Sequence, residues 1–379
     1  MFSMENPLKK LFSFTKQSAS VLGIDVGSSA IKVVQLRKKG GKAVLETYGE
    51  LALGPYGGVE IGQSTNLTTQ KLVEALSDLM AEKEVNLTTN SCGVAIPFSS
   101  SLMSLIEMPL VSFEQLSVMI PLEARKYIPV PISEVTLDWS IIPKEEAAPD
   151  EYDTEKRDPK EPQKIKKTDV LLVAIHNETL TRYQELIRKT GLQSSFFEIE
   201  IFSTMRAVLE EDTTPVMIFD MGAASTKLYI VERGIVRLSH TINRGSQDIT
   251  LMVSKSLGIP VAQAEIIKRN SGLQQGGTAD IRNLVHLSLD YIFSEANQVV
   301  LNYQRKYAKT IGKIVLVGGG SALKGLSELA QSSFQTPVVA GNPFAKTEAP
   351  AFLEDILRET GPEFAVAVGI ALRKLQELS

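Results

Sequence analysis

One short pattern occurs twice in this chain, and it constrains the fold more than any other feature. Asp25, Gly27, Ser28, Ser29 and Lys32 follow an apolar segment typical of a strand. The same offsets are filled after a second such segment by Asp220, Gly222, Ala223, Ala224 and Lys227. A further apolar segment follows each motif, so both indicate a β-hairpin. One copy would be explained by ordinary turn chemistry. Two copies at equivalent places indicate a duplicated fold.

The residue types in both hairpins suit phosphate binding. Gly27 and Gly222 permit turns whose backbone N–H groups point at one spot and form an anion-binding nest. Asp25 and Asp220, each at a strand end, are suited to hold a divalent cation through water, because Mg²⁺ keeps most of its hydration shell. Hydroxyl donors follow in both turns: Ser28, Ser29, Ser225 and Thr226.

A third motif, VLVGGGSALKGL, lies near the C-terminus. Gly318, Gly319 and Gly320 separate an apolar strand from a helix, so a flat ligand can lie against the backbone at the start of that helix. A dinucleotide-binding G-x-G-x-x-G pattern fails because Leu323 stands at its last position. The alternative is that these glycines form a loop that binds no ligand.

Composition excludes several classes of protein. A formal net charge of −4 over 379 residues gives no phosphate-neutralising surface, so we expect no nucleic-acid partner. No apolar run is long enough to span a bilayer. The single cysteine, Cys92, argues for a reducing compartment and is expected to be a small buried residue. His176, His240 and His286 are too scattered to form a metal site.

Changes in residue composition and in hydrophobic pattern along the chain predict its domain organisation. Residues 1–20 form a leader that packs on its own domain or a partner, a weak interfacial helix being the alternative. The remaining boundaries predicted are a first α/β part at 21–87, an inserted α+β unit at 88–192, a return to the first domain at 193–213, a second domain at 214–345 with a helical part at about 250–310, and a closing segment with a helix at 346–379. Within the insertion, residues 143–168 have almost no large apolar side chains and are expected to form a flexible loop.

Together these motifs resemble the actin/Hsp70/sugar-kinase ATPase superfamily, and within it the type IV pilus assembly protein PilM family, a relative of FtsA. The similarity covers essentially the whole chain. It is carried by GIDVGSSAIKVVQL at the first hairpin, EARKYIPVPISEVTLDW in the insertion and FAVAVGIALRKL near the end. The resemblance implies an α/β, duplicated actin-like (ribonuclease H-like) fold with an inserted, SHS2-like α+β subdomain.

The resemblance also implies which residues bind ATP or ADP with Mg²⁺. The first phosphate loop would be Asp25, Gly27, Ser28, Ser29 and Lys32, the second Asp220, Gly222, Ser225 and Thr226, and the adenosine loop Gly318, Gly319, Gly320 and Ser321. QAEIIKR is similar to an AE-x-x-K element, so Glu265 would bind the ribose hydroxyls and Lys268 would flank the adenine. Without the family, Glu265 and Lys268 would be an ordinary pair on a helix surface.

Two departures from the family pattern concern the phosphate region. Ser246 follows Gly245 where many relatives have two glycines, and the second hairpin has alanines where the first has serines. No side chain stands out as an activator of water. Glu107 and Glu123 are possible activators, but strand-end and helix-surface roles suit them better. We therefore expect a nucleotide holder with no catalytic residue and with slow or no ATPase activity.

The family implies a cytoplasmic scaffold peripheral to the inner membrane, working with other pilus assembly components and possibly as a homo-oligomer. Its partner would be the N-terminal cytoplasmic peptide of a PilN-like inner-membrane protein. Arg125, Tyr127, Ile128 and Pro129 would support the peptide groove, with plain helix–strand packing as the alternative. Two other functions stay open: an FtsA-like membrane-tethered filament, disfavoured because the chain ends at KLQELS, and a small-molecule kinase, disfavoured by the lack of a base.

Overall fold

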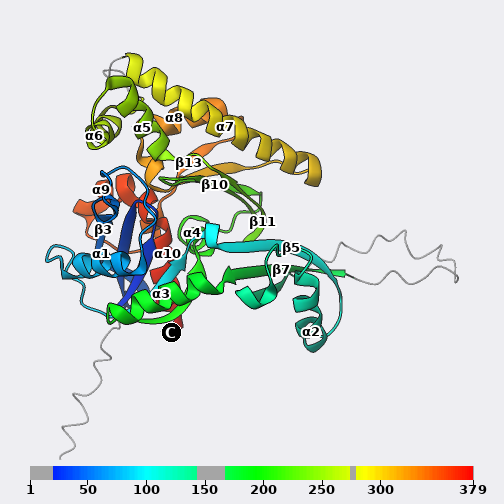
Figure 1. Cartoon of the computed structure of the whole chain (residues 1–379). Helices are drawn as coiled ribbons and strands as arrows, with labels where there is room; N and C mark the ends of the chain where they lie inside the picture. Colours follow the sequence, from blue (N-terminus) through cyan, green and yellow to red (C-terminus); the bar gives the residue numbers. More distant parts are fainter. Residues whose placement is uncertain (1–19, 143–166, 274–278, 379) are drawn as a thin grey trace, which may run out of the picture.

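The structure is a computed structural model that describes residues 20–142, 167–273 and 279–378. Two five-stranded sheets form the centres of two halves, and a smaller three-stranded sheet projects to one side (Figure 1). The predicted leader at 1–20 and the predicted loop at 143–168 lie almost wholly outside the described residues.

The first sheet has the strand order β3-β2-β1-β4-β8. Its strands are β1 (Ser20–Val26), β2 (Ala30–Lys39), β3 (Lys42–Ala52), β4 (Ser91–Ile96) and β8 (Gln193–Ile199). Alternate side chains of β1 bury opposite faces, as the period of a strand requires. Leu22 and Ile24 pack under α1 (Thr69–Ala81) and α3 (Asn177–Lys189), whereas Val21 packs under α10 (Ala365–Glu377).

The second sheet repeats this topology in the order β11-β10-β9-β12-β13. Its strands are β9 (Val216–Met221), β10 (Thr226–Glu232), β11 (Ile235–Ile242), β12 (Lys313–Val317) and β13 (Val338–Ala340). Its helices are α5 (Ser246–Leu257), α6 (Val261–Ser271), α7 (Ala279–Tyr307) and α8 (Leu326–Ser333), while α9 (Glu354–Thr360) precedes α10. In both sheets a hairpin pairs antiparallel and the fourth strand pairs parallel to the first. The duplication predicted from the two hairpins is therefore confirmed by the topology.

Part of the predicted inserted unit at residues 88–192 belongs to the first sheet in the structure. Strand β4 pairs with β1 in the first sheet, and α3 packs against the same sheet. The segment 193–199, which the sequence did not identify as a strand, forms β8 at the edge of that sheet. It leads into α4 (Glu200–Val208).

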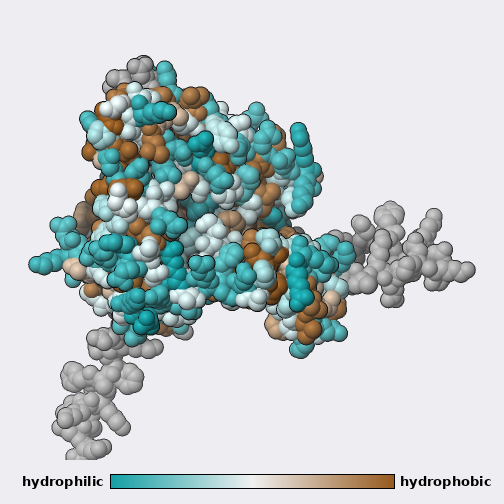
Figure 2. Space-filling model, viewed as in Figure 1, coloured by the Kyte–Doolittle hydropathy of each residue, from teal (hydrophilic) through white to brown (hydrophobic). Residues whose placement is uncertain are grey.

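The inserted subdomain is a three-stranded antiparallel sheet with one helix. Strands β5 (Ser101–Pro109), β7 (Lys167–His176) and β6 (Val135–Ile142) lie in that order, and α2 (Phe113–Ala124) covers the sheet. Trp139 packs partly buried beside this core with its ring 4.8 Å from Phe113. The outer side of α2 is also apolar, because Val118 and Leu122 are exposed there (Figure 2).

Helix α10 ties the first sheet to α4 through two close backbone contacts. A Cβ atom at Gly23 on β1 would lie 2.0 Å from the carbonyl oxygen of Ala367 on α10. A Cβ atom at Gly369 would lie 1.9 Å from the carbonyl oxygen of Ser203 on α4. Both clashes involve backbone, which cannot yield as a flexible side chain can. The closing helix thus needs glycine at both positions.

We predict that Gly369→Ala lowers the free energy of unfolding by about 2 kcal/mol or more, because overpacking outweighs the helix preference of alanine. Urea denaturation followed by circular dichroism measures this change. Gln376→Ala, on the exposed side of the same helix, serves as the control. An unchanged midpoint for Gly369→Ala would contradict the packing account.

Candidate functional site in the cleft between the halves

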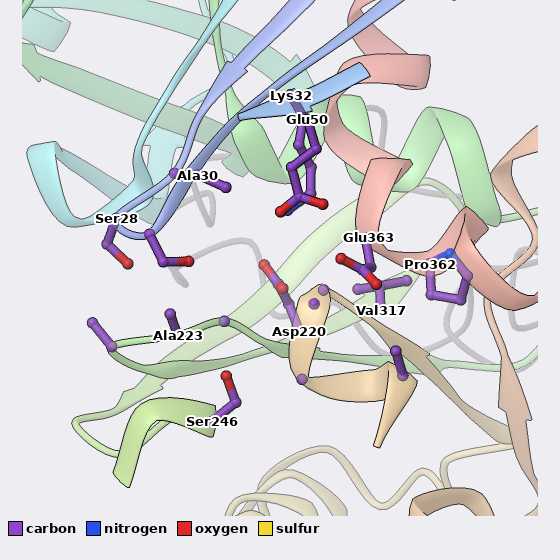
Figure 3. Close-up of a pocket in the computed structure, with 18 of the residues that line it drawn as sticks. Ser28, Ala30, Lys32, Glu50, Asp220, Ala223, Ser246, Val317, Pro362 and Glu363 are labelled. Atoms are coloured by element: carbon purple, nitrogen blue, oxygen red, sulfur yellow. The ribbon is translucent and has the colours of Figure 1, made fainter. Parts of the chain in front are cut away.

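A cleft between the two sheets gathers most of the residues singled out in the sequence. Figure 3 shows the first hairpin with Ser28 and Lys32 on one side and the second, with Asp220 and Ala223, on the other. Of the predicted residues, the cleft is lined by Asp25, Gly27, Ser28, Ser29, Lys32, Asp220, Gly222, Ser225, Glu265, Lys268, Gly318, Gly319 and Gly320.

The two hairpins have matching local geometry. Asp25 stands opposite Lys32 in the first ladder, and Asp220 stands opposite Lys227 in the second. Each turn is closed by one hydrogen bond from the glycine N–H, to the carbonyl of Ala30 at 2.9 Å in the first and of Ser225 at 3.0 Å in the second. The repeated sequence pattern is therefore a repeated structure.

The lysines of the two hairpins have different partners. Lys32 Nζ lies 3.4 Å from a carboxylate oxygen of Glu50 on the neighbouring strand β3. Lys227 Nζ lies 2.7 Å from Glu200 and 3.7 Å from Asp220. Burial alone would lower the pKa of Lys227, but Glu200 and Asp220 offset this effect and raise it. Both lysines are thus charged and bound to carboxylates.

Acidic side chains outnumber basic ones around the cleft. Six carboxylates line it with four cationic side chains: Asp25, Glu50, Glu200, Asp220, Glu265 and Glu363 against Lys32, Lys227, Lys268 and Arg269. Asp25 touches the solvent of the cleft but is otherwise surrounded by protein, and this burial raises its pKa to about 7. Burial likewise raises the pKa values of Asp220 and Glu363. Carboxylates held in this state are suited to exchange a proton for a bound cation.

Glu265 and Lys268 form a buried pair rather than the surface pair that helical spacing alone would suggest. Their exposed fractions are 4% and 6%, and the ion pair measures 2.7 Å. Thr250 Oγ1 donates to Glu265 at 2.6 Å, and Lys268 Nζ donates to Thr250 Oγ1 at 2.9 Å. Arg269 adds a second cation 2.8 Å from Glu265. This pair brings polar groups of α6 to the cleft wall.

The glycine-rich turn lies against the end of β9. Gly318 has a φ of +84°, and a Cβ atom there would lie 2.4 Å from Oδ1 of Asp220. A Cβ atom at Gly320 would lie 2.8 Å from the carbonyl of Met221. Only glycine allows this approach, and the result is a flat backbone wall beside the second hairpin.

Two predicted residues lie outside the cleft lining. Thr226 is fully buried, and its hydroxyl donates to the carbonyl of Arg244 at 2.9 Å. Ser321 donates to the carbonyl of Gly318 at 2.6 Å, within its own turn. Ser246, one of the departures from the family pattern, lines the cleft, and its N–H donates to the carbonyl of Gly222 at 2.9 Å.

A family model for the type IV pilus assembly protein PilM matches residues 23–375. The chain belongs to the PilM family. Among solved structures, the PilM–PilN type IV pilus biogenesis complex is similar over 94% of this chain and 98% of that chain, with a TM-score of 0.76 and 23% identity. The family and the actin-like fold predicted from the sequence are confirmed.

Two further proteins are similar over most of this chain. The cell division protein FtsA of Neisseria meningitidis is 26% identical over 353 residues, which cover 84% of this chain and 82% of that protein. MreB 5 of Spiroplasma citri, bound to AMPPNP, is similar over 96% of this chain and 98% of that chain, with a TM-score of 0.52 and 10% identity.

Glu200 is a cleft residue of this PilM-family chain that the sequence did not reveal. It begins α4 directly after the edge strand β8 and is 7% exposed. Its Oε1 accepts hydrogen bonds from Lys227 Nζ at 2.7 Å and from the backbone N–H of Phe98 at 2.6 Å. Phe98 lies in the connection from β4 to β5 and packs edge-on against Tyr229 of β10. We call this connection, residues 97–100, the neck of the inserted subdomain. Glu200 therefore joins the cleft to the neck.

The other residues considered as water activators lie away from the cleft. Glu107 pairs with Lys167 at 3.1 Å and Glu123 with Lys126 at 2.8 Å, both on the inserted subdomain. Of the residues expected to support a peptide groove, Ile128 is buried in the subdomain core, while Arg125, Tyr127 and Pro129 are exposed. Cys92 is fully buried, as predicted.

Within the described ranges, no group of three or more His, Cys, Asp or Glu side chains is arranged to hold a metal ion. None of the helices in the described part of the chain is long and apolar enough to cross a membrane.

We predict that Asp25→Asn raises the free energy of unfolding of the ligand-free protein, and does so more at pH 8 than at pH 5. The folded carboxyl gains a proton below about pH 7, whereas the unfolded one stays ionised down to about 3.8. The ionised, buried form thus costs progressively more stability as pH rises between these values. The gain should differ by about 2 kcal/mol between the two pH values.

Urea denaturation at both pH values measures the gain, with Asp355→Asn on the exposed part of α9 as the control. An Asp25→Asn gain that is equal at pH 5 and pH 8 would show that Asp25 titrates normally.

Proposed function

We propose that the cleft binds ATP or ADP together with Mg²⁺, and that the chain is a cytoplasmic scaffold for type IV pilus assembly at the inner face of the inner membrane. The observation that carries the first part is the pair of matching Asp–Gly–Lys hairpins facing one cleft. Phosphate oxygens would be met by the turn N–H groups and by the hydroxyls of Ser28, Ser29 and Ser225.

The charge of the cleft supports a bound cation. Carboxylates already outnumber cationic side chains there, so a polyphosphate alone would add repulsion. Asp25 and Asp220 would hold Mg²⁺ through its water shell, and the cation would neutralise phosphate oxygens in return. Glu265 and Lys268 would face the ribose and the adenine, beside the wall formed by Gly318, Gly319 and Gly320.

The arrangement favours holding nucleotide over cleaving it. Among the cleft carboxylates, Glu200 is the one we considered as an activator of water. It already accepts hydrogen bonds from Lys227 and from Phe98. Both donors bind the same oxygen, Oε1, so that oxygen is already engaged within the protein. We therefore propose slow or no hydrolysis, with nucleotide acting through the relative position of the halves.

We predict that ATP with Mg²⁺ binds to the purified full-length chain and that Asp25→Ala and Asp220→Ala each weaken binding at least about tenfold, by removing cation support. Isothermal titration calorimetry with and without Mg²⁺ measures the affinity. Asp355→Ala is the control. Unchanged affinity in both cleft variants would refute the assignment of the site.

The scaffold part of the proposal concerns the inserted subdomain. We propose that it docks the N-terminal cytoplasmic peptide of a PilN-like inner-membrane protein. The structural similarity to a PilM–PilN complex supports this partner. The contact from Glu200 to Phe98 offers a physical route by which nucleotide in the cleft would bias the neck of the subdomain.

We predict that Tyr127→Ala weakens the binding of such a peptide by about tenfold, because an exposed aromatic ring is a common anchor at interfaces. Fluorescence anisotropy of a labelled PilN-like peptide measures the affinity. Phe352→Ala removes an exposed aromatic ring elsewhere and serves as the matched control. Equal losses in both variants would argue against a site at the inserted subdomain.

An FtsA-like, membrane-tethered filament is the second candidate, favoured by the similarity to FtsA of Neisseria meningitidis. Sedimentation of the chain with lipid vesicles and ATP tests it, since a lipid-bound polymer would pellet. A small-molecule kinase of the same superfamily would instead show ATP turnover that depends on a sugar or acid substrate.

A further inference from the structure

The segment between β3 and α1 reaches from the first half to the cleft and to the second half. We refer to residues 53–66 as the strap. Ile61 and Gly62 of the strap line the cleft. A Cβ atom at Gly62 would lie only 2.8 Å from Oε2 of Glu265 on α6. The strap therefore starts from the first half and lies directly against the second.

Both ends of the strap are fastened to the turn of the first hairpin. The N–H of Leu53 donates to the carbonyl of Ser29 at 2.8 Å, and the N–H of Thr65 donates to the carbonyl of Ser28 at 2.7 Å. Ser28 and Ser29 themselves line the cleft. A movement of this turn is thus transmitted to the strap through two backbone hydrogen bonds.

The middle of the strap is fastened to the second half by Glu60. Its carboxylate accepts from the N–H groups of Val261 at 3.3 Å and Ala262 at 2.8 Å. These are the first residues of α6, whose N-cap, Pro260, supplies no capping side chain. Glu60 therefore caps a helix of the opposite half, where a negative charge is favoured by the helix dipole.

A second contact joins the strap to α5. Gln247 Oε1 accepts from the N–H of Ser64 at 2.9 Å and from its hydroxyl at 2.8 Å. Glu60 and Ser64 thus hold the strap to two neighbouring helices. Because α6 also carries Glu265 and Lys268 on the cleft wall, separating these helices from the strap would widen the cleft at its mouth.

We propose that the strap is a latch that limits how fast nucleotide enters and leaves the cleft. This inference rests on the proposed nucleotide site. With the latch closed, the strap and α6 meet over the cleft and restrict passage. Each fastening consists of two hydrogen bonds, to Glu60 in one and to Gln247 in the other, and bonds of such modest net strength can open reversibly. A ligand at Ser28 and Ser29 would act on the same turn to which the strap is tied.

Stopped-flow displacement of a fluorescent ATP analogue with Mg²⁺ by excess ATP tests the latch in the full-length chain. Glu60→Ala and Gln247→Ala should each raise the dissociation rate about three- to tenfold, as expected for losing contacts of modest net strength. Association should also become faster, so the dissociation constant changes less than either rate. Glu74→Ala, which removes an exposed carboxylate of α1 paired with Lys71 at 2.7 Å, is the matched control and should leave the rates unchanged.

Hydrogen exchange of the ligand-free chain gives an independent measurement. The amides of Val261 and Ala262 should exchange faster in Glu60→Ala than in the unmodified chain, because their acceptor is gone. The latch is refuted if the chain binds the analogue and both variants keep its dissociation rate, or if they lose affinity through slower association alone. Failure of the unmodified chain to bind any nucleotide would instead refute the proposed function.

Discussion

Asp25 and Asp220 face one cleft from opposite halves, and Lys32 and Lys227 beside them compensate two like charges that would otherwise repel. The compensation is incomplete, since burial raises the pKa values of both aspartates. Such an arrangement costs stability in the ligand-free chain and is relieved by a cation. In the proposed nucleotide site, the balance of charge would therefore link ligand binding to the closeness of the two halves.

The duplication supplies two similar hairpins, but their surroundings have diverged. Lys32 is paired within its own sheet by Glu50, whereas Lys227 reaches Glu200, a residue of α4 that also contacts Phe98. Only the second lysine is thus connected to the neck of the inserted subdomain. In this duplicated fold, only the second hairpin is placed so that a movement of its lysine would reach the inserted subdomain through Glu200.

The hairpins could be predicted because Asp, Gly and Lys act within a few residues of each other. Glu200 and Glu363 could not, since tertiary packing alone brings their elements to the cleft, and Glu50 depends on the register of β3 against β2, which places it opposite Lys32. Strand β8 was missed because it is an edge strand whose first residues, Gln193–Ser195, are polar and largely exposed. Thr226 was expected beside Ser225, but it is the first residue of β10, and its hydroxyl is buried and donates to the carbonyl of Arg244.

One edge of the first sheet explains why so many different segments meet at the cleft. Strands β1, β3, β4 and β8 run in the same direction, so their carboxyl ends lie together. At or just after these ends lie Asp25 with the turn that follows it, the strap, the neck at Phe98, and Glu200. Ligands of open α/β sheets bind beyond such ends. The strap and the inserted subdomain both leave the fold where a ligand would bind, and each contacts the opposite half, Phe98 through Tyr229 and Glu60 through α6. A change in the distance between the halves must therefore shift both the strap and the inserted subdomain.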